Sequence, residues 1–188
     1  MASAQVQLPH NLQAILKEED SQIDASSERP KDRIEFHARE LTIYRGNDPT
    51  CWQWVYMPDT DGALVEVAVL LRIDRLDVSK VFSAKRLTPG KYYGVYFVLM
   101  MTDGEYGFKD HPVKFQLAIP NCHETIERKE DLSKLPKNKW TVVRLGEFAT
   151  SCNMSGDLKI SMFEQLQQVN PELNQDPIWL EIARLPIQ

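Results

Sequence analysis

Apolar and polar residues alternate over several short stretches in the body of the chain. Val113, Phe115 and Leu117 alternate with polar neighbours, and the stretch from Leu158 to Met162 repeats the pattern. Successive side chains of a strand point to opposite faces, so each stretch predicts a strand that is buried on one side. Tyr92 to Met101 is almost wholly apolar and rich in aromatic and β-branched residues, which predicts a central strand buried on both faces.

The segment from Leu64 to Val81 holds two apolar runs that are out of phase. Leu71 and Ile73 alternate, and the alternation then resumes at Leu76 one residue out of register. A one-residue slip moves every following side chain to the other face of a strand. We therefore expect a bulge or a corner near Asp74-Arg75.

Turn-forming residues separate these runs. They are Asp61-Gly62, Pro89-Gly90, Asp103-Gly104, Pro120-Asn121, Ser155-Gly156 and Pro171. Eight to ten short strands with no strong helical pattern among them predict an all-β fold. The irregular spacing of the strands favours a jelly-roll β-sandwich of two antiparallel sheets, or another Greek-key sandwich, over a meander barrel.

The first 36 residues differ from the rest. Leu12, Ile15 and Leu16 have helical spacing, so a short amphipathic helix is expected from about Asn11 to Glu19. The following residues are polar and hold little that could be buried. We interpret residues 1–36 as a tail that is either docked on the body or partly disordered, and residues 37–188 as one domain.

Composition limits the class of protein. The chain has 188 residues, of which 43% are hydrophobic and 26% charged, as in one ordinary globular domain. No run approaches the length of a membrane-spanning helix, and no secretory signal pattern opens the chain. Three cysteines are too few for a disulfide framework, so a cytoplasmic or nuclear location is expected.

Charge is unevenly distributed along the chain. The net charge is −5, and the acidic excess is greatest in the first 35 residues. A nearly neutral body argues against a broad nucleic-acid surface. One basic run, from Arg128 to Arg144, keeps RNA binding as a third hypothesis, although a solvated strand edge explains the run equally simply.

Signatures of enzymes and metal sites are missing from the sequence. It has no glycine-rich phosphate loop, no serine nucleophile elbow and no cysteine or histidine pair at zinc spacing. His123 follows Cys122, but a lone neighbouring pair does not define a site. We expect no catalytic residue, no metal and no cofactor.

Trp52 and Trp54 are the most distinctive pair of residues. Side chains two apart on a strand share a face, and two indoles on one face suit the apolar side of a sugar ring. Burial of one or both rings in the core is an equally good explanation, because tryptophan is highly buried on average.

The run from Leu41 to Trp54 resembles the opening motif of the phloem protein 2 lectins, the superfamily that includes the tobacco agglutinin-like (Nictaba-like) domain. The other segments that resemble the family follow in the same order: Val65 to Ala68, Leu87 to Tyr93, Val95 to Val98, Tyr106 to Phe108, Lys139-Trp140, Leu145 to Phe148 and Leu180 to Ile182. The resemblance covers the whole body, from Ala38 to Ile187.

The resemblance implies a jelly-roll protein of plant cytoplasm and nucleus, including phloem sieve elements. Members bind N-acetylglucosamine (GlcNAc) oligomers or the core of N-glycans without metal, and often form homodimers. Trp52 and Trp54 match the family's tryptophan pair, and Glu147 matches the glutamate of its Leu-Gly-Glu-Phe motif. Trp52 would be the stacking platform and Glu147 an acceptor for sugar hydroxyls.

Two arginines stand where the family has tryptophan. They are Arg45, whose counterpart tryptophan belongs to the sugar site of the family, and Arg75. Arginine can stack on a sugar or donate hydrogen bonds, so Arg45 joins Trp52, Trp54 and Glu147 as a candidate carbohydrate-binding residue. If Arg45 and Arg75 lie close together, they could instead bind an anion or a protein partner, or simply pair with nearby aspartates. A protein-interaction or structural module that has lost sugar binding is therefore the alternative function.

Overall fold

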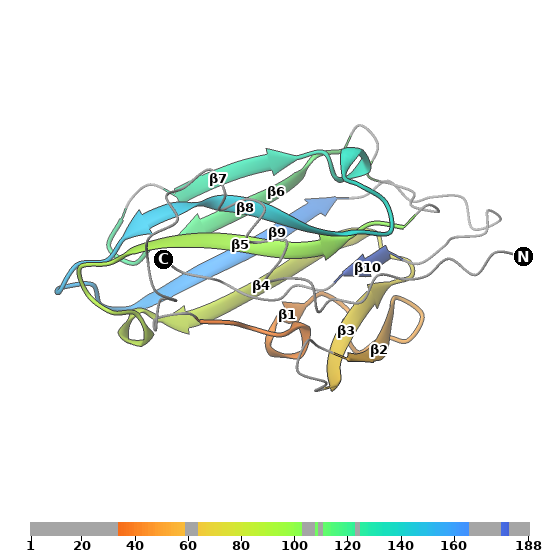
Figure 1. Ribbon diagram of the computed structural model, residues 1–188, viewed down its shortest axis with the longest axis horizontal. Coiled ribbons are helices and arrows are strands. Elements are labelled where there is room, and N and C mark those ends of the chain that lie inside the picture. The colour runs from red at the N-terminus through yellow and green to blue at the C-terminus, as the bar shows by residue number, and fades with distance from the viewer. Residues whose placement is uncertain are drawn as a thin grey trace, which may run out of the picture.

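The computed structural model describes residues 34–58, 64–102, 108, 111–122 and 125–165, and the backbone of 178–180. Ten strands and three short 3-10 helices lie in these ranges (Figure 1). In chain order they are η2 (Ala38–Glu40), β1 (Thr42–Ile43), β2 (Trp52–Pro58), β3 (Leu64–Leu70), β4 (Arg75–Ser83), η3 (Ala84–Arg86), β5 (Tyr92–Met100), β6 (Val113–Ala118), β7 (Thr125–Glu130), η4 (Leu132–Lys134), β8 (Trp140–Ala149), β9 (Asp157–Gln165) and β10 (Ile178–Leu180).

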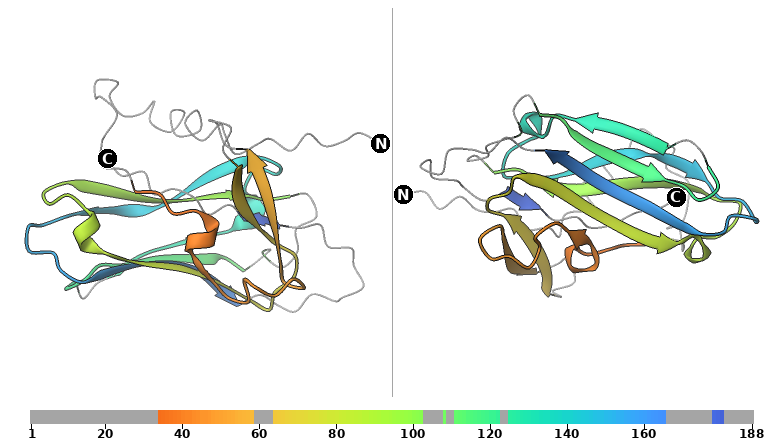
Figure 2. Two further views of the ribbon diagram at one scale, coloured as in Figure 1. Left: turned by 90° about the horizontal axis from the view of Figure 1, so that it is seen from below. Right: turned by 180° about the vertical axis from the view of Figure 1, so that it is seen from behind.

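The strands pair as one long hairpin that has been rolled up. β3 pairs with β10, β4 with β9, β5 with β8 and β6 with β7, all antiparallel. One layer is the sheet β1-β4-β9-β6-β7, and the other contains β10-β3-β2 and β5-β8, with β10 in contact with β5. Figure 2 shows the two layers edge-on in its left view. Nested pairs shared between two layers define a jelly roll, so the predicted all-β jelly-roll sandwich is confirmed.

Alternating side chains fill the space between the layers. Val113, Phe115 and Leu117 on β6 are fully buried while their polar neighbours are half-buried, as the sequence predicts. The ring of Phe97 on β5 meets that of Phe115 at 5.0 Å between centroids. Edge-to-face contacts of this kind add to the stabilisation from burial.

The phase slip between Leu64 and Val81 is a corner. β3 ends at Leu70 and β4 begins at Arg75 in the opposite layer. The amides of Leu71 and Arg72 both donate to the Cys51 carbonyl, at 2.8 and 3.2 Å, which fixes the corner against the start of β2.

One side of the sandwich is closed by contact between its two edge strands, β7 and β8. Arg128 of β7 donates to the Arg144 carbonyl of β8 at 2.8 Å. A Cβ added at Gly146 would lie 2.7 Å from Cγ2 of Ile126. Glycine is therefore needed at this position because the β7 side chain occupies the space above it.

β5 and β8 are apolar on the face that points away from the sandwich interior as well. Val98 and Met100 lie opposite Val142 and Trp140 in the ladder, and Val67 of β3 joins them. We call these five residues the outer apolar face. β5 is thus buried on both sides, as predicted, and Trp140 is buried on this outer side.

Packing of the body begins before residue 37. Phe36 is buried and its ring lies 5.1 Å from that of Phe82, and Ile34 packs against the same core. The expected helix from Asn11 to Glu19 lies outside the described residues, as do the expected turns at 61–62, 103–104 and 171. In the described ranges, no helix is long and apolar enough to cross a membrane.

Candidate functional site

Residues 44–51 connect β1 in one layer to β2 in the other, and we call them the crossover loop. Asp48 organises this loop: its carboxylate accepts from the Thr50 amide at 2.9 Å and the Thr50 hydroxyl at 2.6 Å. Its carbonyl accepts from the amides of Cys51 and Trp52, both at 2.9 Å. The bonds from Thr50 favour the charged carboxylate and lower the pKa of Asp48. The loop is therefore held in one conformation by its own short-range bonds.

The tryptophan pair fastens the crossover loop to β2. The Nε1 of Trp52 donates to the Tyr44 carbonyl at 3.0 Å, and that of Trp54 donates to the Gly46 carbonyl at 2.8 Å. Both indoles share one face of the strand, as the spacing predicts. Trp52 is only 2% exposed, so the expectation of an open Trp52 platform is wrong. Its ring is buried beneath the crossover loop, where its nitrogen is bonded to the Tyr44 carbonyl.

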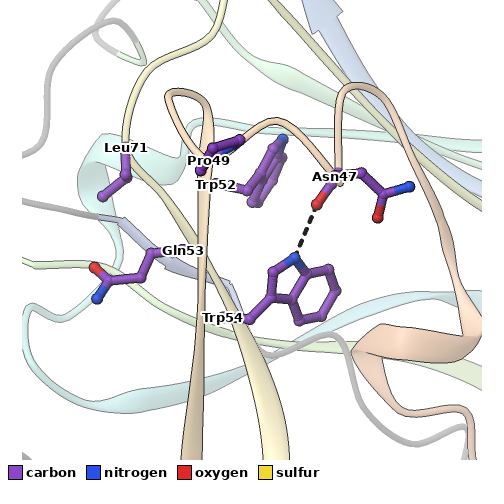
Figure 3. Close-up of a pocket in the computed structure, with 7 residues that line it drawn as sticks. Asn47, Pro49, Trp52, Gln53, Trp54 and Leu71 are labelled. Atoms are coloured by element: carbon purple, nitrogen blue, oxygen red, sulfur yellow. Dashed lines mark hydrogen bonds between the residues drawn. The ribbon is translucent and has the colours of Figure 1, made fainter.

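A pocket of about 290 Å³ opens beside Trp54. It is lined by Gly46, Asn47, Pro49, Trp52, Gln53, Trp54 and Leu71. Figure 3 shows Asn47 on the same side of the strand as the Trp54 ring, while Gln53 and Leu71 lie on the other side. Trp54 is half-buried, and the amides of Asn47 and Gln53 are exposed. The pocket thus combines an indole with polar groups that can both donate and accept hydrogen bonds.

Arg39 of η2 lies over the Trp54 ring, with its guanidinium carbon 3.6 Å from the ring centroid. Glu66 holds this guanidinium in a two-pronged ion pair, in which Nη2 donates to Oε1 at 3.0 Å and Nε donates to Oε2. The hydrogen bonds from Arg39 lower the pKa of Glu66. Arg39 therefore occupies part of the space from which a ligand would approach the indole.

Tyr56 extends the aromatic row along β2. It is 63% exposed and lies opposite Glu66 in the ladder, and its hydrogen bond to that carboxylate raises the pKa of Tyr56. Neither Tyr56 nor Arg39 was predicted from the sequence. Tyr56 could have been predicted, because it follows Trp52 and Trp54 at the same spacing of two residues. No pattern in the sequence predicts that Arg39 lies over the Trp54 ring.

Arg45 and Arg75 do come together, since both lie near the ring of Tyr44. Their guanidinium carbons lie 5.4 and 4.7 Å from the centroid of Tyr44. Arg45 has a left-handed backbone, with φ of 54°. Arg75 pairs with Asp77 at 3.1 Å. Neither arginine lines the pocket, although Arg45 precedes Gly46, which does.

Glu147 is not brought to the pocket. It lies on β8, is half exposed and forms an ion pair with Arg144. The pocket is built from the crossover loop, β2 and the start of the corner after β3, and no residue of β8 lines it.

Three of the six basic residues in the run from Arg128 to Arg144 form ion pairs with nearby carboxylates. Arg128 pairs with Glu130 at 2.8 Å, and Lys134 with Asp131 at 3.0 Å. Arg144 pairs with Glu147. Cations that already have carboxylate partners are poor candidates for a phosphate-binding surface, so the structure offers the RNA hypothesis little support.

The described residues contain no group of three or more potential metal ligands. Cys51, the last residue of the crossover loop, is a buried free thiol, and Cys122 is free and exposed. Cys51 thus has the structural place expected of an isolated buried cysteine.

Comparisons with known proteins agree with one another on the family. The profile of the family described as Phloem protein 2 matches residues 31–170. Protein PHLOEM PROTEIN 2-LIKE A1 of Arabidopsis thaliana is 32% identical over 87% of this chain and 76% of its own length. Protein PHLOEM PROTEIN 2-LIKE A2 of the same plant is 39% identical over 53% of this chain and 50% of its own. A protein of Luffa acutangula named "Lectin" is 27% identical over 68% of this chain and 60% of its own.

Solved structures with a similar arrangement include carbohydrate-binding modules. TmCBM61 in complex with β-1,4-galactotriose has a TM-score of 0.39 and 10% identity, over 87% of this chain and all of that one. The C-terminal family 22 module of Clostridium thermocellum Xyn10B has a TM-score of 0.42 and 11% identity, over 80% of this chain and 92% of that one.

Proposed function

Because the chain belongs to the phloem protein 2 family, we propose that it is a non-enzymatic carbohydrate-binding protein for GlcNAc oligomers or the GlcNAc-containing core of N-glycans. The match over residues 31–170 and the relative named as a lectin support this class of function. The site is the pocket beside Trp54.

The observation that carries the proposal is the half-buried Trp54 ring in a pocket whose lining also includes two exposed side-chain amides, one on each side of β2. A pyranose presents a C–H face that packs on an indole, and hydroxyls at its edge that exchange hydrogen bonds with amides. Asn47 and Gln53 supply those amides from the pocket lining. The pocket is near the lower end of the volume range of small-molecule sites, about 300–1,000 Å³, so it suits a single sugar ring.

Among the residues expected from the sequence, each has a different part in this site. Trp54 is the contact surface, and Trp52 supports the loop and closes one wall. Arg45 precedes the lining residue Gly46 but does not itself line the pocket. Glu147 is outside the proposed site.

Isothermal titration calorimetry with N,N′,N″-triacetylchitotriose tests the proposal. Asn47→Ala and Gln53→Ala should each weaken binding about fivefold, the equivalent of one hydrogen bond worth about 1 kcal/mol. Asn153→Ala, an exposed amide in the β8–β9 connection, is the matched control and should bind as the wild type does. Absence of saturable binding by the wild type, or equal binding by all three variants, would reject the site.

The alternative is a protein-interaction or structural module on the same fold. It is favoured by one observation, the Arg39 guanidinium that already covers the Trp54 ring at 3.6 Å. A glycan array that gives no signal, together with co-purification of a partner that Tyr56→Ala abolishes, would support this alternative.

A further inference from the structure

We propose that the N-terminal segment around Leu12, Ile15 and Leu16 docks on the outer apolar face of this same chain. The outer apolar face lies on the far side of the β5–β8 ladder from the sandwich core. This face and the pocket beside Trp54 share no residue.

The face is covered although it points away from the sandwich interior. Val67, Val98, Met100 and Trp140 are at most 2% exposed, and Val142 is 8% exposed. Val55 and Tyr96, which pack against them, belong to the strands of the same layer. Neighbours within a sheet shield the edges of a side chain but not its outward surface. Another segment must therefore lie over the face.

Stretches of this same chain that lie outside the described ranges can supply the proposed cover. The long stretches outside the described ranges are residues 1–33, 166–177 and 181–188. Of these, residues 1–33 include the apolar stripe Leu12, Ile15 and Leu16 at helical spacing. A short isolated helix is marginal in water, so it needs its apolar stripe to pack against another apolar surface. The outer apolar face is such a surface.

Chain length permits the docking. The 14 residues from 20 to 33 join the stripe to Ile34, where the packed body begins. They can span up to about 46 Å, whereas a nine-residue strand such as β5 is about 30 Å long. The stripe can therefore reach any part of the outer apolar face.

Charge and hydrogen bonding are complementary as well. Glu18-Glu19-Asp20 follows the stripe directly, and Lys139 borders the face immediately before Trp140, the first residue of β8. The Trp140 Nε1 is buried and has no hydrogen-bond partner within the described ranges. A buried donor without a partner is costly, so this nitrogen favours a cover that brings a polar acceptor to it.

The indole N–H resonance of Trp140 in the full-length chain provides the test, with its assignment taken from Trp140→Phe. The variant Ile15→Asp/Leu16→Asp should shift this resonance, speed its exchange with solvent and raise the fluorescence of a hydrophobic dye several-fold. Gln13→Asp/Ala14→Asp adds the same charge on the opposite side of the expected helix and should leave all three readouts as in the wild type. Circular dichroism confirms that each variant keeps its sheets.

Two outcomes would overturn the proposal. One is a Trp140 resonance that is the same in wild type and in Ile15→Asp/Leu16→Asp, or that moves equally in both tail variants. The other is a shift produced by Ile182→Asp/Ile187→Asp and not by the N-terminal variant, which would assign the cover to the C-terminal segment.

Discussion

Single side chains in this molecule serve both the loop and the pocket. Trp54 uses its nitrogen for the Gly46 carbonyl and leaves its ring half-buried at the pocket, whereas Trp52 uses both nitrogen and ring inside the body. The two indoles differ in burial although they share a face of one strand. The difference arises because the crossover loop covers the Trp52 ring, whereas the Trp54 ring borders the pocket.

This difference predicts unequal effects on stability. Trp52→Ala should lower the free energy of unfolding by about 3–5 kcal/mol, the usual cost of removing a fully buried large aromatic ring. Trp54→Ala should cost clearly less, because its ring is partly in solvent before the change. Urea unfolding followed by far-ultraviolet circular dichroism measures both, and equal losses would contradict the placement of the two rings.

Arg39 controls access to the Trp54 ring. Arg39→Ala should lower the free energy of unfolding by no more than about 1 kcal/mol, because exposed ion pairs and cation–π contacts are individually weak. It should nevertheless increase quenching of tryptophan fluorescence by acrylamide. Arg86→Ala is the matched control, since Arg86 lies over Phe36 instead. Unchanged quenching in Arg39→Ala would show that the guanidinium does not shield the ring.

Asp48 makes the crossover loop sensitive to acid. Its pKa is lowered in the folded protein, so its contribution is complete above the unfolded value of about 3.9 and is lost as pH falls through the lower folded value. Asp48→Asn should therefore be less stable than wild type at pH 7, and this gap should narrow by pH 2–3. Urea midpoints at both pH values measure the gap, and a gap that widens in acid would contradict the sign.

At the scale of elements, alternation predicts the strands well. The runs at 113–119 and 158–162 and the apolar run at 92–101 correspond to β6, β9 and β5. In each case, most of the apolar positions in the sequence are positions whose side chains are buried in the folded sheet. The slip near residue 74 could be read as a bulge or a corner, because periodicity reports a change of face but not a change of layer.

The contact between β7 and β8 is a feature that the sequence does not reveal. The need for glycine at position 146 could not be predicted from the sequence, because only the folded structure places Ile126 above it. Gly146→Ala should cost about 1–3 kcal/mol of stability, the usual penalty for overpacking.

A second substitution separates this clash from other effects of losing a glycine. Truncating the obstructing side chain in Gly146→Ala/Ile126→Ala should recover part of the loss, so the double variant should be more stable than the sum of the single effects predicts. Strict additivity of the two changes, measured by chemical denaturation, would show that no clash exists.

At the scale of the whole molecule, the family motifs predicted the architecture but not the details of the site. Residue order along the chain places Trp52 and Trp54 on β2, yet their exposure depends on where the crossover loop lies. Arg39 and Glu66 are 27 positions apart and meet only because η2 lies against β3. Glu147 was expected from a motif, but its strand belongs to another part of the sandwich.

β10 holds the second layer together, because its three residues pair with β3 and contact β5. A chain that ends at residue 177 should therefore leave β3 with a free edge and β5 without its neighbour. Exposed strand edges promote association, so we expect loss of cooperative unfolding and a larger species in size-exclusion chromatography. A monomer with the wild-type unfolding midpoint would contradict this role.

The nested order of the strand pairs also has a consequence during translation. β6 and β7 are neighbours in sequence, whereas β3 must wait for β10, which is made more than a hundred residues later. At about 5–20 residues per second, the ribosome leaves β3 without that partner for several seconds or more. The nascent protein must therefore form the β6–β7 pair before the β3–β10 pair. Its early strands stay without these partners for longest, so we expect chaperones to bind there.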